Sequence, residues 1–149
     1  MDDVSLQIAA WGRRPRAVRL NRAEFCALSG HDVEGAALAR FAQDSNVTIG
    51  LTGETDIVLS DGRLVCIGNG DPLMTRVTAM GCAAGALVAA CLAVESDAWI
   101  ATAAGLLIVG VAGQIAAGHA LGPGSLATGI LDAVYALDRA TLIEHARVV

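Results

Sequence analysis

The stretch from Gly70 to Cys82, GDPLMTRVTAMGC, leads without a break into a run of small apolar residues, AAGALVAACLAV, which ends at Val94. This pattern predicts a glycine-containing loop followed by a helix. The backbone N–H groups and the dipole at the start of a helix attract anions such as phosphate. Cys82 lies at that start, where a thiolate is favoured. The stretch therefore indicates a phosphate cradle beside a candidate catalytic group, an arrangement that suits phosphoryl transfer.

The length and the composition favour one globular domain. The chain has 149 residues and is 54% hydrophobic but only 3% aromatic, so Ala, Val, Leu and Gly must fill its core. The formal net charge is −5, and the ten basic residues form no run longer than Arg13-Arg14-Pro15-Arg16. We therefore expect no nucleic-acid partner, because binding nucleic acid requires a basic patch.

The cysteines and the N-terminal residues indicate the cellular compartment of the protein. The four cysteines, Cys26, Cys66, Cys82 and Cys91, form no CxxC pair. Their scatter favours reduced cytosolic thiols over a disulfide framework or a zinc site. The N-terminal residues MDDVSLQ are too polar for a signal peptide. We therefore expect a cytoplasmic protein.

Two charge-free runs, Val77–Val94 and Ala98–Gly118, leave a small membrane hairpin as an alternative, because each is long enough to cross a bilayer as a helix. Against it, both runs are rich in Ala and Gly, and their connector Glu95-Ser96-Asp97 is acidic. Neither a Lys/Arg asymmetry nor an aromatic belt sets an orientation. We therefore expect no membrane contact and a pair of helices buried inside an α/β protein.

Periodicity and turn residues predict an α/β layered fold with a mostly parallel sheet, because strands alternate with helices before a C-terminal run of three helices. A β-hairpin is expected at Asp61-Gly62, and Ser125 is expected to cap the last helix. The expected strands are Ala17–Leu20, Val47–Leu51, Asp56–Leu59 and Leu64–Ile67. The expected helices are Val4–Trp11, Asn21–Leu28, Val33–Gln43, Cys82–Val94, Ala98–Leu121 and Leu126–Glu144.

Four patches resemble the hydroxyethylthiazole kinase family of the ribokinase-like superfamily, in the order in which that family carries them. The family motifs are R-x-N-x-x-E, T-G-E-x-D, P-x-M-x-x-V-T-G-x-G-C, and G-P-G-S with a closing L-D-A-L. The similar patches here are Arg19–Glu24, Thr52–Asp56, Pro72–Cys82, and Gly122–Ser125 with Leu131–Ala133. The resemblance covers nearly the whole chain, but only the C-terminal part of a typical family member.

The resemblance implies that residues 1–149 are one incomplete ribokinase-like domain. It implies ATP-dependent phosphorylation of the hydroxyl of hydroxyethylthiazole, a reaction of thiamine biosynthesis and salvage. Cys82 matches the catalytic cysteine, which would lie beside that hydroxyl. Gly81 matches the anion hole for the transferring phosphoryl group, and Ala79 matches a position that lies against the thiazole.

The remaining motif positions imply the nucleotide side of a site. Arg19 and Thr52 match residues that contact ATP, while Asn21 and Glu24 match a pair that is linked to Mg²⁺, usually through water. Chemistry alone leaves other roles open. Arg19 is also compatible with a solvated charge, Thr52 with a turn, Asn21 and Glu24 with a helix cap, and Cys82 with a small core residue.

The signature departs from the family pattern at two positions. Ala79 stands where the family has glycine, and Met80 replaces a smaller residue. A Cβ at position 79 is unfavourable if the backbone there needs a positive φ. A non-catalytic nucleotide-binding or assembly module is therefore an alternative function.

The N-terminal half of the family, which supplies further strands and part of the thiazole pocket, has no counterpart in this sequence. We therefore expect an open sheet edge and uncovered apolar surface, which favour association. The expected partners are copies of the same chain, as in the trimers of the family, or a separately encoded N-terminal half. The isolated chain is expected to turn over poorly.

Overall fold

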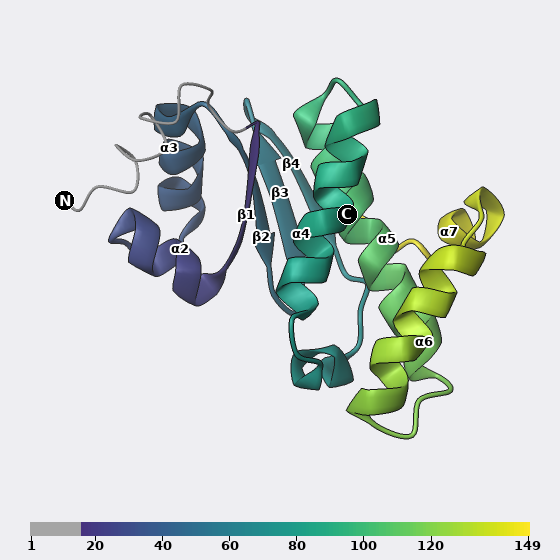
Figure 1. Ribbon diagram of the computed structural model, residues 1–149. Helices are drawn as coiled ribbons and strands as arrows, with labels where there is room; N and C mark the ends of the chain where they lie inside the picture. The colour runs from purple at the N-terminus through teal and green to yellow at the C-terminus, as the bar shows by residue number, and fades with distance from the viewer. Residues whose placement is uncertain (1–15) are drawn as a thin grey trace.

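The computed structural model describes residues 16–149 as a four-stranded sheet with helices on both faces (Figure 1). The strands are β1 (Ala17–Asn21), β2 (Thr48–Thr52), β3 (Asp56–Ser60) and β4 (Arg63–Ile67). The helices are α2 (Arg22–Ser29), α3 (Gly35–Ser45), η1 (Pro72–Arg76, a 3₁₀-helix), α4 (Met80–Val94), α5 (Ala98–Ala117), α6 (Pro123–Ala136) and α7 (Arg139–His145). The predicted α/β class is confirmed, while the helix expected at Val4–Trp11 lies outside the described residues.

The prediction of a mostly parallel sheet is wrong. The order is β1-β2-β3-β4, and only β1 and β2 run parallel, whereas the β2–β3 and β3–β4 pairs are antiparallel. Helices α2 and α3 form the crossover between the two parallel strands. The connection between β2 and β3 is too short for a second crossover, which needs a dozen or more residues, so it makes an antiparallel turn. The hairpin predicted at Asp61-Gly62 is confirmed.

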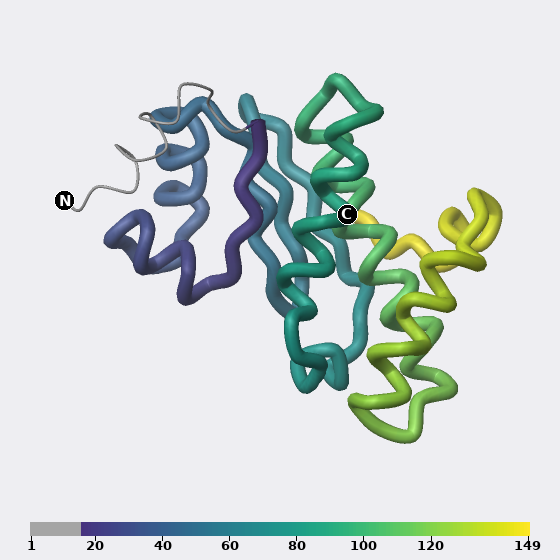
Figure 2. Tube along the Cα trace, viewed as in Figure 1, coloured from purple at the N-terminus to yellow at the C-terminus, as the bar shows by residue number. Residues whose placement is uncertain are grey.

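Each face of the sheet has its own apolar core. Helices α2 and α3 lie against one face, and the other helices lie on the opposite side of the sheet (Figures 1 and 2). Ile49 and Leu51 of β2 pack with Phe25 of α2 on the first face. Val58 of β3 packs with Leu106 of α5 on the second. Successive strand residues therefore alternate between the two cores, as the pleat requires.

Glycines allow α5 to lie unusually close to its neighbours. A Cβ at Gly50 of β2 would stand 2.9 Å from Thr102 Cγ2 of α5. A Cβ at Gly105 of α5 would stand 2.7 Å from Val88 Cα of α4. Close packing of the backbones thus fills this core without aromatic rings. This explains why the chain is rich in small residues and poor in aromatic ones.

The helix α5 is a core helix. Among the described helices, only α5 is long and apolar enough to cross a membrane, and 56% of that stretch is buried. The 15 residues of α4 fall short of the ~20 that a span requires. The burial of α5 between the sheet and its neighbouring helices counts against the membrane hairpin. The prediction of two buried helices holds for α5 and is wrong for α4, of which only Ala84 and Val88 are buried.

The last predicted helix, Leu126–Glu144, is two helices. Helix α6 ends at Ala136, and α7 begins at Arg139. Asp138 causes the restart, because its carboxylate accepts a hydrogen bond from the N–H of Thr141 at 2.8 Å. An aspartate inside an apolar helical pattern is a helix-start signal that the periodicity concealed.

The start of α6 also differs from the prediction. Gly122, rather than Ser125, is the N-cap, and Pro123 occupies the first helical position, where its missing N–H costs nothing. Ser125 still serves the helix start, because its hydroxyl accepts hydrogen bonds from the N–H groups of Leu121 at 2.9 Å and Gly122 at 3.2 Å.

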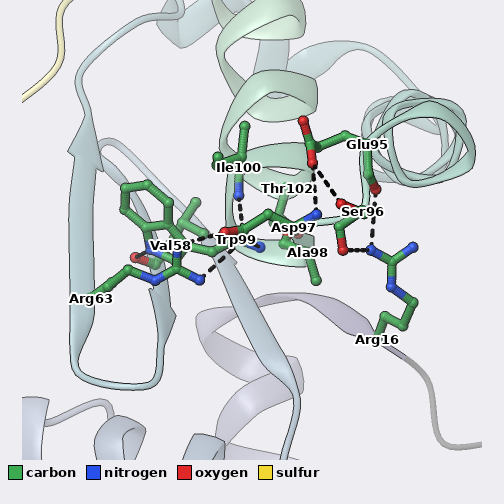
Figure 3. Close-up of polar contacts among 10 residues, drawn as sticks. All are labelled: Arg16, Val58, Arg63, Glu95, Ser96, Asp97, Ala98, Trp99, Ile100 and Thr102. Carbon is green, nitrogen blue, oxygen red and sulfur yellow. Dashed lines mark hydrogen bonds and ion pairs between the residues drawn. The ribbon is translucent and has the colours of Figure 1, made fainter.

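Side chains that we call the connector latch (Arg16, Arg63, Asp97 and Trp99) hold the α4–α5 connector against the sheet (Figure 3). Arg63 donates to both oxygens of Asp97, at 2.7 and 3.1 Å, and its guanidinium lies 5.0 Å from the centroid of Trp99. Trp99 Nε1 donates to the carbonyl of Val58 at 3.2 Å. Arg16 donates to the backbone carbonyls of Leu92, Glu95 and Ser96.

Candidate functional site

A cavity of about 1220 Å³ opens where β1 and β2 end and α4 begins, at the opposite end of the sheet from the latch. It exceeds the ~300–1,000 Å³ of ordinary small-molecule pockets and so has room for a nucleotide and a second ligand. The candidate site residues of the sequence analysis all line it, namely Arg19, Asn21, Glu24, Thr52, Ala79, Gly81 and Cys82, whereas the fourth patch, at Gly122–Ser125, is not part of its lining. Residues from three separate segments of the chain therefore meet in one place.

The start of α4 is built to receive an anion. Its first internal hydrogen bond runs from the N–H of Ala83 to the carbonyl of Ala79, at 3.0 Å. The N–H groups of Met80, Gly81 and Cys82 precede that bond and have no partner within the helix. No side chain caps this end of the helix. Cys82 lies in the first turn and is exposed, so it is not a core residue.

Arg19 faces the start of α4. Its Nη1 donates to Thr52 Oγ1 at 3.0 Å, and its Nη2 lies 3.3 Å from Glu24 Oε2. A Cβ at Gly81 would stand 3.1 Å from Arg19 Nη2, so the absence of a side chain there makes room for the guanidinium. With a side chain only 18% exposed, Arg19 is no solvated surface charge. A fixed cation and the positive end of a helix thus face the same space.

Ala79 has a left-handed backbone, with φ 63° and ψ 16°. The sequence analysis noted that a Cβ is unfavourable here if the backbone has a positive φ, and the structure shows that φ is positive. Such a conformation costs a non-glycine residue roughly 1–2 kcal/mol, because Cβ approaches the following carbonyl oxygen. A glycine would avoid that cost, and Ala79 retains it beside the cavity.

Comparison with known proteins gives one consistent result. The model of the hydroxyethylthiazole kinase family matches residues 13–140. The chain belongs to the hydroxyethylthiazole kinase family. It is 43% identical over 147 residues to a hydroxyethylthiazole kinase of Granulibacter bethesdensis, and the match covers 90% of this chain and 54% of that protein. A hydroxyethylthiazole kinase of Tolumonas auensis is 38% identical over 147 residues, covering 89% of this chain and 55% of that protein.

A solved structure shares the fold of this hydroxyethylthiazole kinase family member. The hydroxyethylthiazole kinase structure from Pyrococcus horikoshii OT3 superposes with a TM-score of 0.85 at 33% identity, covering 98% of this chain and 58% of that one. The chain therefore spans a little over half the length of the relatives that it matches.

Asn21 and Glu24 form the capping box that the sequence allowed. Asn21 Oδ1 accepts from the N–H of Glu24 at 2.8 Å, and Glu24 Oε2 accepts from the N–H of Asn21 at 2.7 Å. Both residues also line the cavity. Both the cap and a contact with an ion through water are therefore compatible with one arrangement.

The cavity suits magnesium held through water better than a direct metal cage. Among residues 16–149, no group of three or more His, Cys, Asp or Glu side chains lies close enough to hold a metal ion. The cavity nevertheless carries the carboxylates of Glu24, Glu54, Asp56 and Asp71 against the one guanidinium of Arg19. Magnesium prefers oxygen ligands, keeps several waters and completes its shell with substrate phosphates. The donor set present therefore fits the ion only together with a polyphosphate.

The sequence analysis gave no role to Asp56, which also lines the cavity. Its Oδ1 accepts from the N–H of Gly53 at 2.9 Å. Burial raises the pKa of Asp56 from 3.8 to about 6, against the opposing effects of the Gly53 hydrogen bond and the Arg19 charge. The T-G-E-x-D motif contained the signal, since Asp56 is its last residue.

Asn69 is a second residue that the sequence analysis missed. It is buried, its Nδ2 donates to Gln114 Oε1 at 3.0 Å and to the carbonyl of His145 at 2.8 Å, and its Oδ1 accepts from the N–H of Arg147 at 2.7 Å. Figure 2 shows the last residues returning from α7 toward the sheet, where this amide holds them. Asn69 thereby fixes the loop between β4 and η1, which lines the cavity.

Proposed function

We propose that the chain carries the phosphoryl-transfer part of a hydroxyethylthiazole kinase, which moves the γ-phosphate of ATP to the hydroxyl of hydroxyethylthiazole with the help of Mg²⁺. The observation that carries the proposal is the meeting of Cys82, the start of α4 and Arg19 in one cavity. Membership of the family supports the reaction class. Positioning and charge stabilisation do most of the work in phosphoryl transfer, and this end of the fold supplies both.

Each side chain has a part in the proposed reaction. Cys82 lies beside the thiazole hydroxyl and accepts its proton as the oxygen attacks phosphorus. The N–H group of Gly81 and its neighbours in the first turn donate to the phosphoryl oxygens as charge gathers on them. Arg19 and Thr52 bind the phosphates that remain on the nucleotide, with Arg19 held in place by its bond to Thr52.

Ala79, at the entrance to α4, lies against the thiazole. Asn21 and Glu24 would hold a magnesium ion through water, and the ion would supply charge neutralisation for the phosphates. Glu24 is already oriented for this by its hydrogen bond to the N–H of Asn21 at 2.7 Å.

The proposed working form contains at least one further chain. Helix α4 is free of charge from Met80 to Val94, yet only Ala84 and Val88 of it are buried. Strand β1 forms one edge of the sheet. Uncovered apolar helix surface beside an open edge favours association. We propose that this surface is covered by copies of the same chain or by a separately encoded N-terminal half, in the cytoplasm, and that residues 1–149 are one part of the complete domain.

A non-catalytic nucleotide-binding or assembly module is the second candidate, and Ala79 is the observation that favours it. A strained residue with a Cβ stands where the thiazole would approach, whereas Arg19 and Thr52 on the nucleotide side fit together. This alternative requires binding of ATP without transfer to the alcohol.

A transfer assay separates the candidates. The chain is incubated with MgATP and hydroxyethylthiazole, and phosphorylated thiazole is measured by mass spectrometry. We expect little product from the chain alone and more when a co-expressed N-terminal half completes the thiazole side. In that complete form we expect Cys82→Ala to lower the rate by roughly 10²–10⁴-fold, the usual contribution of a positioned acid or base. Cys91→Ala, in the same helix but outside the cavity lining, is the matched control and keeps the rate.

Two results of this assay would count against the kinase. Full activity of Cys82→Ala would remove Cys82 from the reaction. ATP binding without product, in the presence as well as the absence of the co-expressed N-terminal half, would favour the non-catalytic module.

A further inference from the structure

The residues after α7 lie along the outer edge of β4. Cys66 of β4 exchanges two backbone hydrogen bonds with Val149, at 2.8 and 3.0 Å. The N–H of Gly68 donates to the carbonyl of Arg147 at 2.8 Å. We call residues 145–149 the C-terminal clasp. None of them lines the cavity, so an effect of the clasp on a ligand has to pass through other residues.

Asn69 is the side chain that joins the clasp to the loop before η1. It is 7% exposed. Its two side-chain N–H groups donate to Gln114 Oε1 at 3.0 Å and to the carbonyl of His145 at 2.8 Å, and its oxygen accepts from the N–H of Arg147 at 2.7 Å. An amide is the side chain of this size that offers both the donors and the acceptor. Since both N–H groups are used, the Asn69 side chain has none left for a ligand, although it lines the cavity.

The loop and η1 lie directly on α5, because two glycines of that helix leave room for them. A Cβ at Gly110 would stand 3.0 Å from the carbonyl oxygen of Asn69. A Cβ at Gly113 would stand 2.6 Å from Met74 Cε of η1. The segment is therefore held between α5 on one side and the clasp on the other.

Hydrogen bonds continue from this loop to the start of α4. Asp71 caps η1 with its side chain, and its carbonyl accepts from the N–H of Met74 at 2.9 Å. The carbonyl of Met74 accepts in turn from the N–H of Val77 at 3.1 Å. Ala79, two residues later, is the N-cap of α4. A displacement at Asn69 is therefore passed along a short, bonded segment to the N–H groups at the start of α4.

We propose that the C-terminal clasp, acting through Asn69, positions the anion end of the cavity. It determines how the N–H groups at the start of α4 are directed, and so how tightly they bind a phosphate. The proposal rests on the proposed function and deepens it, because it assigns a part in phosphate binding to residues that lie outside the cavity. Asn69 is in this account a positioning residue that contacts no reacting atom.

Two variants test the proposal from opposite sides of the contact. Asn69→Ala removes the amide but keeps the Cβ and adds no charge to the cavity. Deletion of residues 147–149 leaves Asn69 in place and removes the N–H from which its oxygen accepts. In ¹⁵N NMR spectra of the ligand-free chain, we expect both variants to shift the amide signals of Gly81 and Cys82. In calorimetry with MgATP, we expect both to bind about tenfold more weakly than the wild type, since a hydrogen bond to the amide is lost.

Two controls separate positioning from a general loss of stability. Arg147→Ala removes an exposed side chain but keeps the main-chain N–H that Asn69 uses, so it should leave the signals and the affinity unchanged. Trp99→Phe removes the hydrogen bond to the carbonyl of Val58 in the connector latch. It should lower the melting temperature without changing the affinity for MgATP at a temperature where every variant is folded.

The outcomes distinguish the clasp from the proposed function. If the wild type binds MgATP and both variants bind it equally well, the role of the clasp is overturned while the anion site stands. Unchanged signals of Gly81 and Cys82 in both variants overturn it as well, as does an equal loss of affinity in Trp99→Phe. A folded wild-type chain that binds no MgATP overturns the proposed function, and the clasp loses its part in phosphate binding with it.

Discussion

The two ends of the sheet shift the pKa of an aspartate in opposite directions. At the cavity end, burial raises the pKa of Asp56 to about 6. At the latch end, the hydrogen bonds from Arg63 lower the pKa of Asp97 to about 2. The cavity end also holds the strained Ala79, whereas the latch end pairs Arg16 and Arg63 with several acceptors. The buried carboxyl and the strained residue lower the stability of the fold at the cavity end, whereas the arginine contacts raise it at the latch end. This distribution is expected when one end binds ligands and the other stabilises the fold.

Arg16 precedes β1 and belongs to the latch, whereas Arg19 lies in the middle of β1 and lines the cavity, so the two arginines give the sharpest test of this division. Arg19→Ala should weaken MgATP binding by roughly 30- to 100-fold, because a charge-assisted hydrogen bond is worth about 2–3 kcal/mol. Arg16→Ala should lower the melting temperature by a few degrees and leave the affinity for MgATP unchanged. Calorimetry and thermal unfolding of both variants measure the two effects, and a loss of nucleotide affinity in Arg16→Ala would break the division.

The pH dependence of stability should reveal the two aspartates separately. Because the folded pKa of Asp56 lies above its unfolded value of 3.8, the folded state binds the extra proton between pH 3.8 and about 6. Its contribution to stability therefore falls as the pH rises through that window, by about 2–3 kcal/mol in total. Urea unfolding of Asp56→Asn should lack this fall. An identical pH profile in the variant and the wild type would show that Asp56 is not destabilised by burial.

Ala79→Gly should stabilise the fold. Removing Cβ relieves roughly 1–2 kcal/mol of left-handed strain, and the more flexible unfolded chain offsets about 0.4–1 kcal/mol of that gain. The expected net gain is about 0.5–1 kcal/mol in urea unfolding. Asn46, which also has a positive φ at 52°, supplies the comparison: Asn46→Gly should gain less, because asparagine tolerates this conformation better than alanine. A loss of stability in Ala79→Gly would contradict the strain.

The smallest expected effect is at the latch. Asp97→Asn weakens the pair with Arg63 but keeps an oxygen for the N–H groups of Trp99 and Ile100 at the start of α5. We expect the melting temperature to fall by about 1–3 °C near neutral pH, since exposed pairs contribute little. The folded pKa of Asp97 lies below its unfolded value, so this contribution is present above pH 3.8 and disappears as the pH falls toward about 2. The difference between variant and wild type should therefore vanish in acid.

Local patterns in the sequence predicted most of the helices and strands and the residues that line the candidate site. The box of Asn21 and Glu24, the hairpin at Asp61-Gly62 and the short motifs around the cavity rest on neighbouring residues, so a single sequence carries them. Strand direction could not be read in the same way, because it depends on which strands pair. The raised pKa of Asp56 depends on burial by segments far along the chain, and periodicity does not report burial of that kind.

The most direct test of the account is calorimetry of the purified wild-type chain with MgATP, with and without hydroxyethylthiazole. The nucleotide side of the proposed site, Arg19, Thr52 and the start of α4, lies entirely within this chain. We therefore predict that the chain alone binds MgATP. We predict that hydroxyethylthiazole strengthens this binding when the partner that completes the thiazole side is present. A folded chain that binds no MgATP would contradict the account, because the cavity would then hold the family motifs without their function.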